Sequence, residues 1–136
     1  MSDAPKTLMD FVQAARAQIK EIDGETLSRM MEENTDLLVV DVREHSEHEH
    51  GHLKNAHLVP RGIIEAAADL SYPKHDEMLY TAREKPVVLY CATGGRSAMA
   101  AMVLEMMGFR EVYSLAGGIV KWNEEKRPLV KEASYV

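Results

Sequence analysis

Cys91 is the only cysteine of the chain, and the residues around it favour a chemical role. It ends the apolar run 86–90 and precedes a loop that contains the adjacent glycines Gly94 and Gly95. Glycines let the backbone turn tightly and point successive N–H groups toward an anion. A helix that begins just after this loop, near Ser97, would direct its positive end to the same spot, so the thiol should ionise more easily. A lone cysteine is otherwise a buried, inert residue, but this loop favours a nucleophile.

Asp41 occupies a similar place at the end of another apolar run, 37–42. Unbroken apolar runs of this length are typical of strands that are buried on both faces of a parallel sheet. In open parallel sheets, ligands bind beyond the carboxyl ends of the strands. We therefore expect Asp41 and Cys91 to lie at the functional edge of one sheet.

The elements that must position these residues alternate between strand and helix. A helical pattern runs from about residue 97 to residue 107, a third apolar run covers 112–115, and a short helical pattern over 119–126 follows. Four apolar residues at helical spacing are expected to form the buried face of the longer helix: Met99, Met102, Val103 and Met106. The alternation predicts an α/β fold with parallel strands and right-handed crossovers. Cys91 is expected to lie outside the packed core.

Helices are also predicted before the first strand. Thr7 is a suitable N-cap for a helix whose apolar residues recur at spacings of three and four: Leu8, Phe11, Val12, Ala15 and Ile19. This helix is expected to pack on the domain surface, where Phe11 and Val12 could support self-association. Asp23 is the expected N-cap of a second helix over Gly24–Glu33. The segment 62–85 is less regular, with a short helix expected near residues 63–68.

Three motifs follow one another along the chain. They are Asp41-Val42-Arg43-Glu44 with Glu47, Gly51-His52-Leu53, Ala56 and Pro60; the loop 91–97; and Gly108-Phe109 with Leu115-Ala116-Gly117-Gly118 and Trp122. In this order they resemble the rhodanese (sulfurtransferase) domains, from about residue 22 to residue 122. The resemblance implies a five-stranded parallel sheet flanked by helices on both faces, here with an extra N-terminal helix. It divides the chain into an N-terminal helical extension (1–20), a rhodanese domain (21–127) and a C-terminal tail (128–136).

The resemblance implies transfer of sulfane sulfur, with no cofactor. Cys91 would attack thiosulfate or a persulfide donor and become a persulfide, which a thiol or cyanide would then discharge. The backbone amides of the loop would hold the charged sulfur: Ala92, Thr93, Gly94, Gly95 and Ser97. Arg96 would shape the loop and balance charge, with Asp41 or Glu47 as its partner and Arg43 as a further supporting residue. Since the chain has no second cysteine, the sulfur must leave to an outside acceptor.

Loop length separates this interpretation from related phosphatases and arsenate reductases. Those enzymes place five residues between the nucleophilic cysteine and the arginine, whereas four separate Cys91 from Arg96. The shorter loop resembles that of the sulfurtransferases and makes a phosphatase or arsenate reductase the minor alternative. The other alternative is a non-catalytic rhodanese module for protein binding or regulation. Such modules usually lose the cysteine that this chain keeps.

Two departures from the family concern the sulfur donor. In two-domain thiosulfate sulfurtransferases, basic residues that contact the anionic donor occupy the positions equivalent to Glu47 and Thr93. Neither side chain is cationic here. The resemblance therefore leaves the choice between thiosulfate and a persulfide open.

Four histidines crowd eight consecutive positions: His45, His48, His50 and His52. Zinc or nickel would accept such ligands together with the neighbouring carboxylates. Metal sites usually also draw ligands from other parts of the fold. We therefore prefer a solvated turn and predict no metal.

Composition and charge narrow the range of functions. The chain has 136 residues, as expected for one domain, and 46% are hydrophobic, which is enough to pack a core. The charge balance of 16 − 22 = −6 argues against binding to nucleic acid or an anionic membrane. The N-terminus lacks a signal-peptide pattern, and no run approaches the roughly 20 apolar residues of a membrane helix. We expect a cytoplasmic monomer or weak homodimer whose partners are a small-molecule sulfur donor and a thiol, cyanide or protein acceptor.

Overall fold

The computed structural model describes residues 4–34 and 36–131, and within them it contains one sheet of five parallel strands. The strands are β1 (Lys20–Ile22), β2 (Leu38–Asp41), β3 (His57–Leu58), β4 (Pro86–Tyr90) and β5 (Glu111–Leu115). They lie in the order β1-β5-β4-β2-β3, and each neighbouring pair is parallel. The five-stranded α/β sheet is confirmed.

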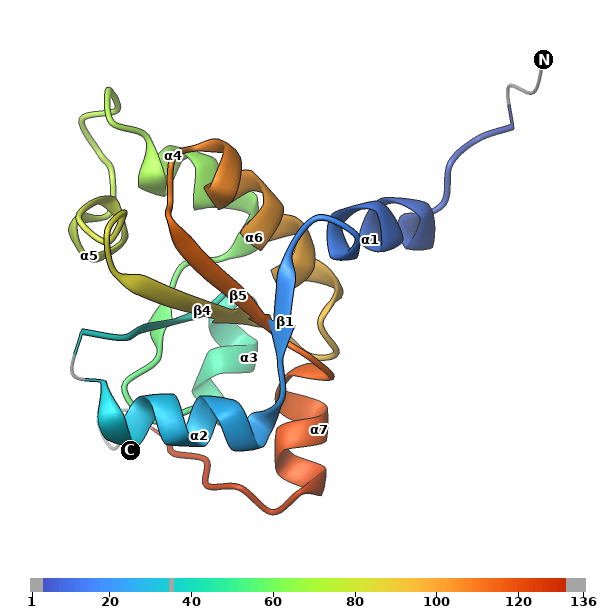
Figure 1. Cartoon of the computed structure of the whole chain (residues 1–136), viewed down its shortest axis with the longest axis vertical. Coiled ribbons are helices and arrows are strands. Elements are labelled where there is room, and N and C mark those ends of the chain that lie inside the picture. Colours follow the sequence, from blue (N-terminus) through green and yellow to red (C-terminus); the bar gives the residue numbers. More distant parts are fainter. Residues whose placement is uncertain (1–3, 35, 132–136) are drawn as a thin grey trace.

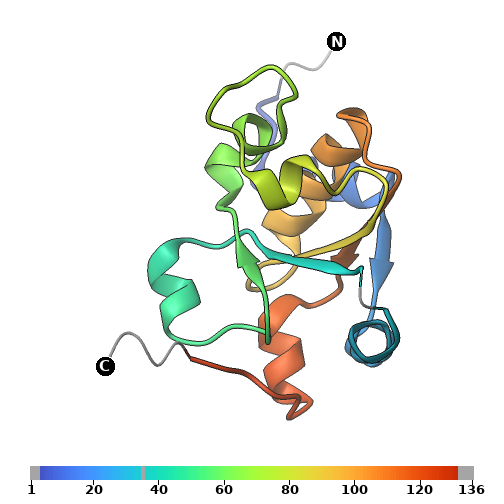
Figure 2. The same ribbon diagram turned by 90° about the vertical axis from the view of Figure 1, so that its left-hand side faces the viewer.

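Seven α-helices surround the sheet in the described residues: α1 (Leu8–Arg16), α2 (Gly24–Glu33), α3 (His45–Glu49), α4 (Ile64–Ala68), α5 (Glu77–Tyr80), α6 (Gly95–Met106) and α7 (Gly118–Glu124). A 3₁₀ turn over Arg61–Ile63 precedes α4. Helices α4, α5 and α6 lie on one side of the sheet, and α2 and α7 lie on the other (Figures 1 and 2). None of these helices is long and apolar enough to cross a bilayer.

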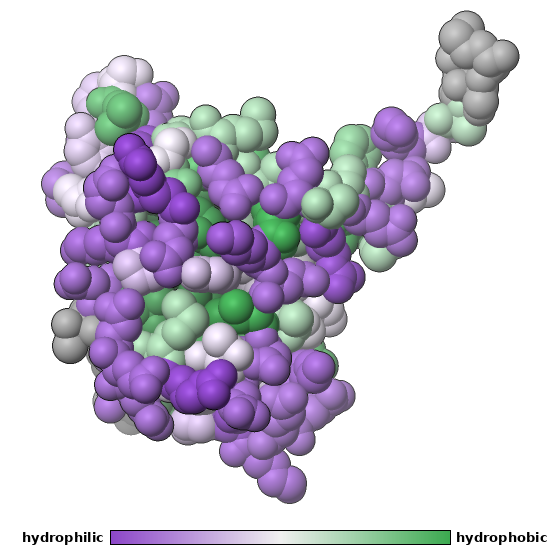
Figure 3. Space-filling model, viewed as in Figure 1, coloured by the Kyte–Doolittle hydropathy of each residue, from purple (hydrophilic) through white to green (hydrophobic). Residues whose placement is uncertain are grey.

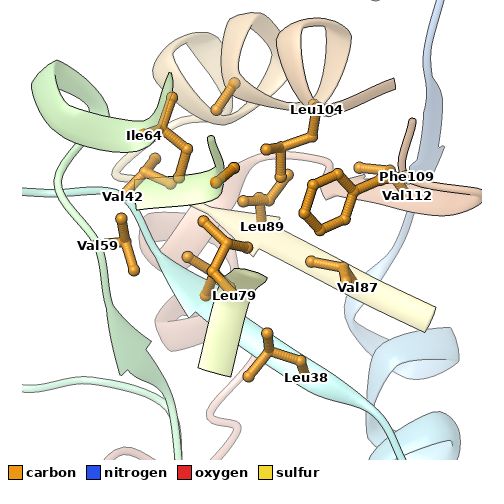
Figure 4. Packing of buried hydrophobic residues seen from close by; sticks show 14 of the residues in the cluster. Leu38, Val42, Val59, Ile64, Leu79, Val87, Leu89, Leu104, Phe109 and Val112 are labelled. Atoms are coloured by element: carbon orange, nitrogen blue, oxygen red, sulfur yellow. The ribbon is translucent and has the colours of Figure 1, made fainter. Parts of the chain in front are cut away.

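The strands are apolar throughout because both faces of the sheet are covered. Alternate residues of β4 point to opposite sides, so that Val87 and Leu89 pack under α4, α5 and α6, whereas Val88 and Tyr90 pack toward α2 and α7. Figure 4 shows the first of these two clusters, in which Leu104 and Phe109 close over Leu89 and Val87. This two-sided burial is what the continuous apolar runs predict.

The buried face of α6 differs from the prediction. Its fully buried apolar residues are three alanines and one leucine: Ala98, Ala100, Ala101 and Leu104. Met99, Met102 and Val103 are only half-buried, and Met106 is 79% exposed. The helix is apolar on nearly every side, so periodicity could not identify its buried face. Alanines occupy that face because α6 packs closely between the sheet and α1.

Helix α1 lies beside α6 at the edge of the domain (Figure 1). Its predicted N-cap is confirmed, because the Thr7 hydroxyl accepts a hydrogen bond from the Asp10 N–H at 3.2 Å. Val12 and Ala15 are buried, whereas Phe11 is 53% exposed and Ile19 lies beyond the end of the helix. The expected single apolar face is therefore split between a buried and an exposed side. Apolar residues, in green, interrupt the polar surface along α1 in Figure 3.

Candidate active site

Cys91 lies directly after β4, at the carboxyl edge of the sheet. Its Sγ accepts a hydrogen bond from the Gly94 N–H at 3.1 Å and lies 3.6 Å from Ser97 Oγ, which in turn is 2.8 Å from Ser114 Oγ. Only 1% of Cys91 is exposed, and it packs within the larger apolar cluster. The expectation that Cys91 lies outside the core is wrong, because the buried part of the sheet extends one residue beyond β4, under α6.

Gly94 turns the loop into α6. Its φ of +108° lies in the left-handed region, which residues other than glycine rarely adopt. Gly94 is also the N-cap of α6. The helix begins at Gly95, two residues before the predicted start at Ser97. The first turn of α6 therefore belongs to the loop itself. Its unpaired N–H groups and positive dipole end lie beside the thiol, as the sequence predicts.

The start of α7 supports the loop from the other side. The N–H of Ile119 donates to the Cys91 carbonyl at 2.9 Å, and the N–H of Val120 donates to the Ala92 carbonyl at 3.0 Å. A Cβ on Gly118 would overlap the backbone of Cys91 and Ala92, so only glycine permits this approach. The third sequence motif thus fixes the backbone that carries the nucleophile.

Arg96 pairs with Glu47 and not with Asp41. Its Nη1 and Nη2 donate to the two carboxylate oxygens of Glu47 at 2.9 and 3.1 Å. Glu47 is also held by a hydrogen bond from the backbone N–H of Glu44, which caps α3. The hydrogen bonds from Arg96 lower the pKa of Glu47 to about 2 and outweigh burial, which acts in the opposite direction. The guanidinium of Arg96 is therefore neutralised by Glu47, which is ionised at neutral pH.

Asp41 forms a separate, fully buried network below the loop. Its carboxylate accepts from Nε, Nη2 and the backbone N–H of Arg43, at distances of 2.8 to 3.0 Å. The Tyr90 hydroxyl donates to the same carboxylate at 2.9 Å, and His48 Nδ1 lies 2.9 Å from it. Burial raises the pKa of Asp41, but the hydrogen bonds from Arg43 and His48 outweigh burial, so the pKa of this carboxyl is lowered overall. Asp41 and Arg43 thus pair with each other and not with Arg96, and Tyr90 is a further partner that the sequence does not predict.

The histidine cluster makes contacts of its own. The rings of His48 and His52 stack with their centroids 3.8 Å apart, and His52 Nδ1 lies 3.0 Å from the His48 carbonyl. His50 Nδ1 lies 2.6 Å from the Ser46 carbonyl, and His45 Nδ1 lies 3.2 Å from Glu49. Across residues 4–34 and 36–131, no three His, Cys, Asp or Glu side chains are placed to hold a metal ion.

A pocket of about 150 Å³ opens over the loop. Its lining brings together five residues of the predicted site: Cys91, Ala92, Thr93, Gly95 and Arg96. Leu8 and Val12 of α1 and Met99 of α6 complete the wall, which is almost entirely apolar. The sequence predicts only a packing role for Leu8, Val12 and Met99, because no local pattern marks them as part of a site.

Comparison of the sequence with known protein families agrees with this fold. A family model described as the rhodanese-like domain matches residues 23–125. The chain therefore belongs to the rhodanese-like domain family. A protein named sulfurtransferase from Allochromatium vinosum is 31% identical, over 82% of this chain and 95% of its own length. A tRNA uridine(34) hydroxylase from Photorhabdus laumondii is 34% identical over 78% of this chain, but this chain spans only 29% of that relative.

Solved structures of other proteins resemble this rhodanese-like domain in fold. A protein of unknown function from Rhodopseudomonas palustris, described as a possible tyrosine phosphatase, has a TM-score of 0.86 at 24% identity, over 96% of this chain and 98% of its own. That likeness shows the fold alone. The polysulfide-sulfur transferase homodimer of Wolinella succinogenes has a TM-score of 0.68 at 30% identity, over 90% of this chain and 85% of its own.

Proposed function

We propose that this protein is a sulfurtransferase in which Cys91 carries sulfane sulfur as a persulfide. The donor is thiosulfate or a small persulfide, and the acceptor is a thiol or cyanide. The observation that carries the proposal is the position of Cys91, whose sulfur accepts a backbone N–H and which lines an open pocket. The relatives named as sulfurtransferases support the same reaction class.

The reaction needs two displacements at sulfur. The Cys91 thiolate attacks the outer sulfur of the donor, a new S–S bond forms, and the donor's own S–S bond breaks with its electron pair on the leaving group. A thiol or cyanide then attacks the outer sulfur of the persulfide, and the Cys91 thiolate is regenerated. The Gly94 N–H and the positive end of α6 stabilise negative charge on sulfur in both steps.

The electrostatics of the loop support sulfur transfer over phosphate chemistry. A phosphoryl group carried on Cys91 would place two negative charges in the loop and would need cations to balance them. The guanidinium at the loop is that of Arg96, and Glu47 already binds both of its terminal nitrogens. A single thiolate or persulfide can be held by the loop amides without this arginine.

Intact-mass spectrometry tests the proposal. After incubation with thiosulfate or glutathione persulfide, the wild-type protein should gain one sulfur atom, and cyanide should remove it. Cys91→Ser should gain none, and circular dichroism should show that it is folded, because a serine hydroxyl can keep the contacts to Gly94 and Ser97. The proposal is wrong if neither donor adds a cyanide-labile sulfur to the wild-type protein.

A further inference from the structure

Helix α1 forms part of the wall of the pocket over Cys91. This helix, Leu8–Arg16, ends before the first residue matched by the family model, which is residue 23. We infer that α1 makes the site selective for donors in which the sulfane sulfur is bonded to a sulfur atom that carries a small apolar organic group. The inference rests on the proposed sulfur transfer and adds the chemical class of the donor.

The position of Val12 is fixed by close packing against the loop. A Cβ at position 95 would lie 3.3 Å from Val12 Cγ2, so Gly95 lets α1 approach the loop directly. Val12 is only 5% exposed, whereas Leu8, one turn earlier in α1, is 69% exposed. Both line the pocket. Val12 therefore forms the inner part of the wall, and Leu8 lies at the mouth.

The lining of the pocket carries no cation that is free to bind an anionic donor. Arg96 is the charged residue among the lining residues, and its guanidinium is held by both oxygens of Glu47. A dianion such as thiosulfate would lose water against Leu8, Val12 and Met99 without gaining a countercharge from a free side chain. An apolar group would instead gain from leaving water at the same surface.

The size of the pocket sets the size of this group. Its volume is about 150 Å³, and an apolar cavity of about 150 Å³ holds a molecule the size of benzene. An aryl or short alkyl group on the sulfur atom that carries the sulfane sulfur therefore fits beside α1. An inorganic donor such as thiosulfate has no apolar group to contact Leu8 and Val12.

Organic thiosulfonates are suitable probes because their reacting atoms are the same whatever group they carry. In benzenethiosulfonate and methanethiosulfonate, the Cys91 thiolate attacks the terminal sulfur and the S–S bond breaks. The electron pair leaves on benzenesulfinate or methanesulfinate, and the enzyme persulfide keeps the transferred sulfur. Cyanide then removes that sulfur as thiocyanate and restores the thiolate. Charge and leaving atom match, so the two donors differ chiefly in apolar size.

The measurement is the ratio of kcat/KM for the benzene donor to kcat/KM for the methane donor, with cyanide as acceptor. We expect a ratio of about ten in the wild-type protein, as for other apolar pockets that gain a larger group. Leu8→Ser should lower the ratio about threefold, and Val12→Ala should lower it by a similar factor. Met9→Ser is the matched control, since Met9 is 51% exposed on the same helix but does not line the pocket. It should leave the ratio unchanged.

The outcomes separate the two proposals. If sulfur is transferred but Leu8→Ser and Val12→Ala have the same ratio as the wild-type protein and Met9→Ser, the inference about α1 is overturned. The sulfurtransferase proposal then stands. If neither thiosulfonate gives a cyanide-labile sulfur on Cys91 while thiosulfate or glutathione persulfide does, the inference about α1 fails and the sulfurtransferase proposal stands. If none of the four donors does, both fail. A fall in the ratio with Leu8→Ser, which replaces an exposed side chain and leaves the core intact, supports selection by α1.

Discussion

Two arginine–carboxylate pairs lie near the nucleophile, and they differ in their surroundings. Arg43 and Asp41 are two residues apart, with side chains that are 8% and 0% exposed. Arg96 and Glu47 are 49 residues apart in the sequence, and each side chain is 34% exposed. Both pairs are bidentate, with distances between 2.8 and 3.1 Å. The difference between them is burial, and burial decides what each pair contributes.

The buried pair has every partner fixed by the fold. The carboxylate of Asp41 is shared with Tyr90 and His48, and Arg43 also donates to the Gly51 carbonyl at 2.8 Å. Removing one member leaves another charge without a partner in a region that water does not reach. If one member of the half-exposed pair of Arg96 and Glu47 is removed, water can hydrogen-bond the other. This pair should therefore contribute less to stability than to the electrostatic potential at the loop. Stability should therefore depend on the first pair, and donor preference on the second.

The largest effect is expected from Asp41→Asn. This change keeps the shape of the side chain but leaves the buried guanidinium of Arg43 without its countercharge. We expect the free energy of unfolding to fall by about 3 to 5 kcal/mol. Urea unfolding followed by circular dichroism measures it. Asp36→Asn is the control, since Asp36 is exposed and accepts no hydrogen bond from Arg43. A loss no greater than that of the control would show that the buried pair does not hold the fold.

A smaller effect is expected from Glu47→Gln, and it should act on donor preference. The amide can still accept from the Glu44 N–H but no longer neutralises Arg96. A freed cation beside the pocket should raise kcat/KM for thiosulfate about tenfold at low ionic strength, and added salt should reduce the gain. Initial rates of thiocyanate formation provide the measurement. Glu105→Gln, on an exposed position of α6, should change little. Equal thiosulfate rates in the two variants would contradict a role for Glu47 in excluding anions.

The sequence is informative about the loop because local rules control it. Apolar runs locate β2, β4 and β5, and the positions of Cys91 and Gly94 follow from a strand that meets a helix. Apolar runs do not predict β1 and β3. They are the two edge strands of the sheet, only three and two residues long, and none of these residues is buried. Their existence was implied only by the family resemblance.

Contacts between distant segments are harder to predict. Glu47 and Asp41 are both carboxylates near the first motif, and only the capped turn of α3 decides which of them reaches Arg96. Periodicity shows that α1 has apolar residues but not that Leu8 and Val12 lie over Cys91. The almost uniform apolar character of α6 likewise hides which side meets α1. Such choices depend on how whole elements pack, which no short pattern records.

The smallest effect is a dependence of stability on pH that comes from the Glu47 carboxylate. The folded-state pKa of Glu47 is about 2, below its ordinary value of 4.5, so the stability that it contributes is present above pH 4.5 and is lost as the pH falls toward 2. Because the pair is partly exposed, this contribution is at most about 1 kcal/mol. The difference in unfolding free energy between the wild-type protein and Glu47→Gln should therefore narrow steadily over this range. Urea unfolding at a series of pH values measures it. A difference that stays constant below pH 4.5 would mean that the Glu47 charge contributes nothing to stability, and that its role is confined to the potential at Cys91.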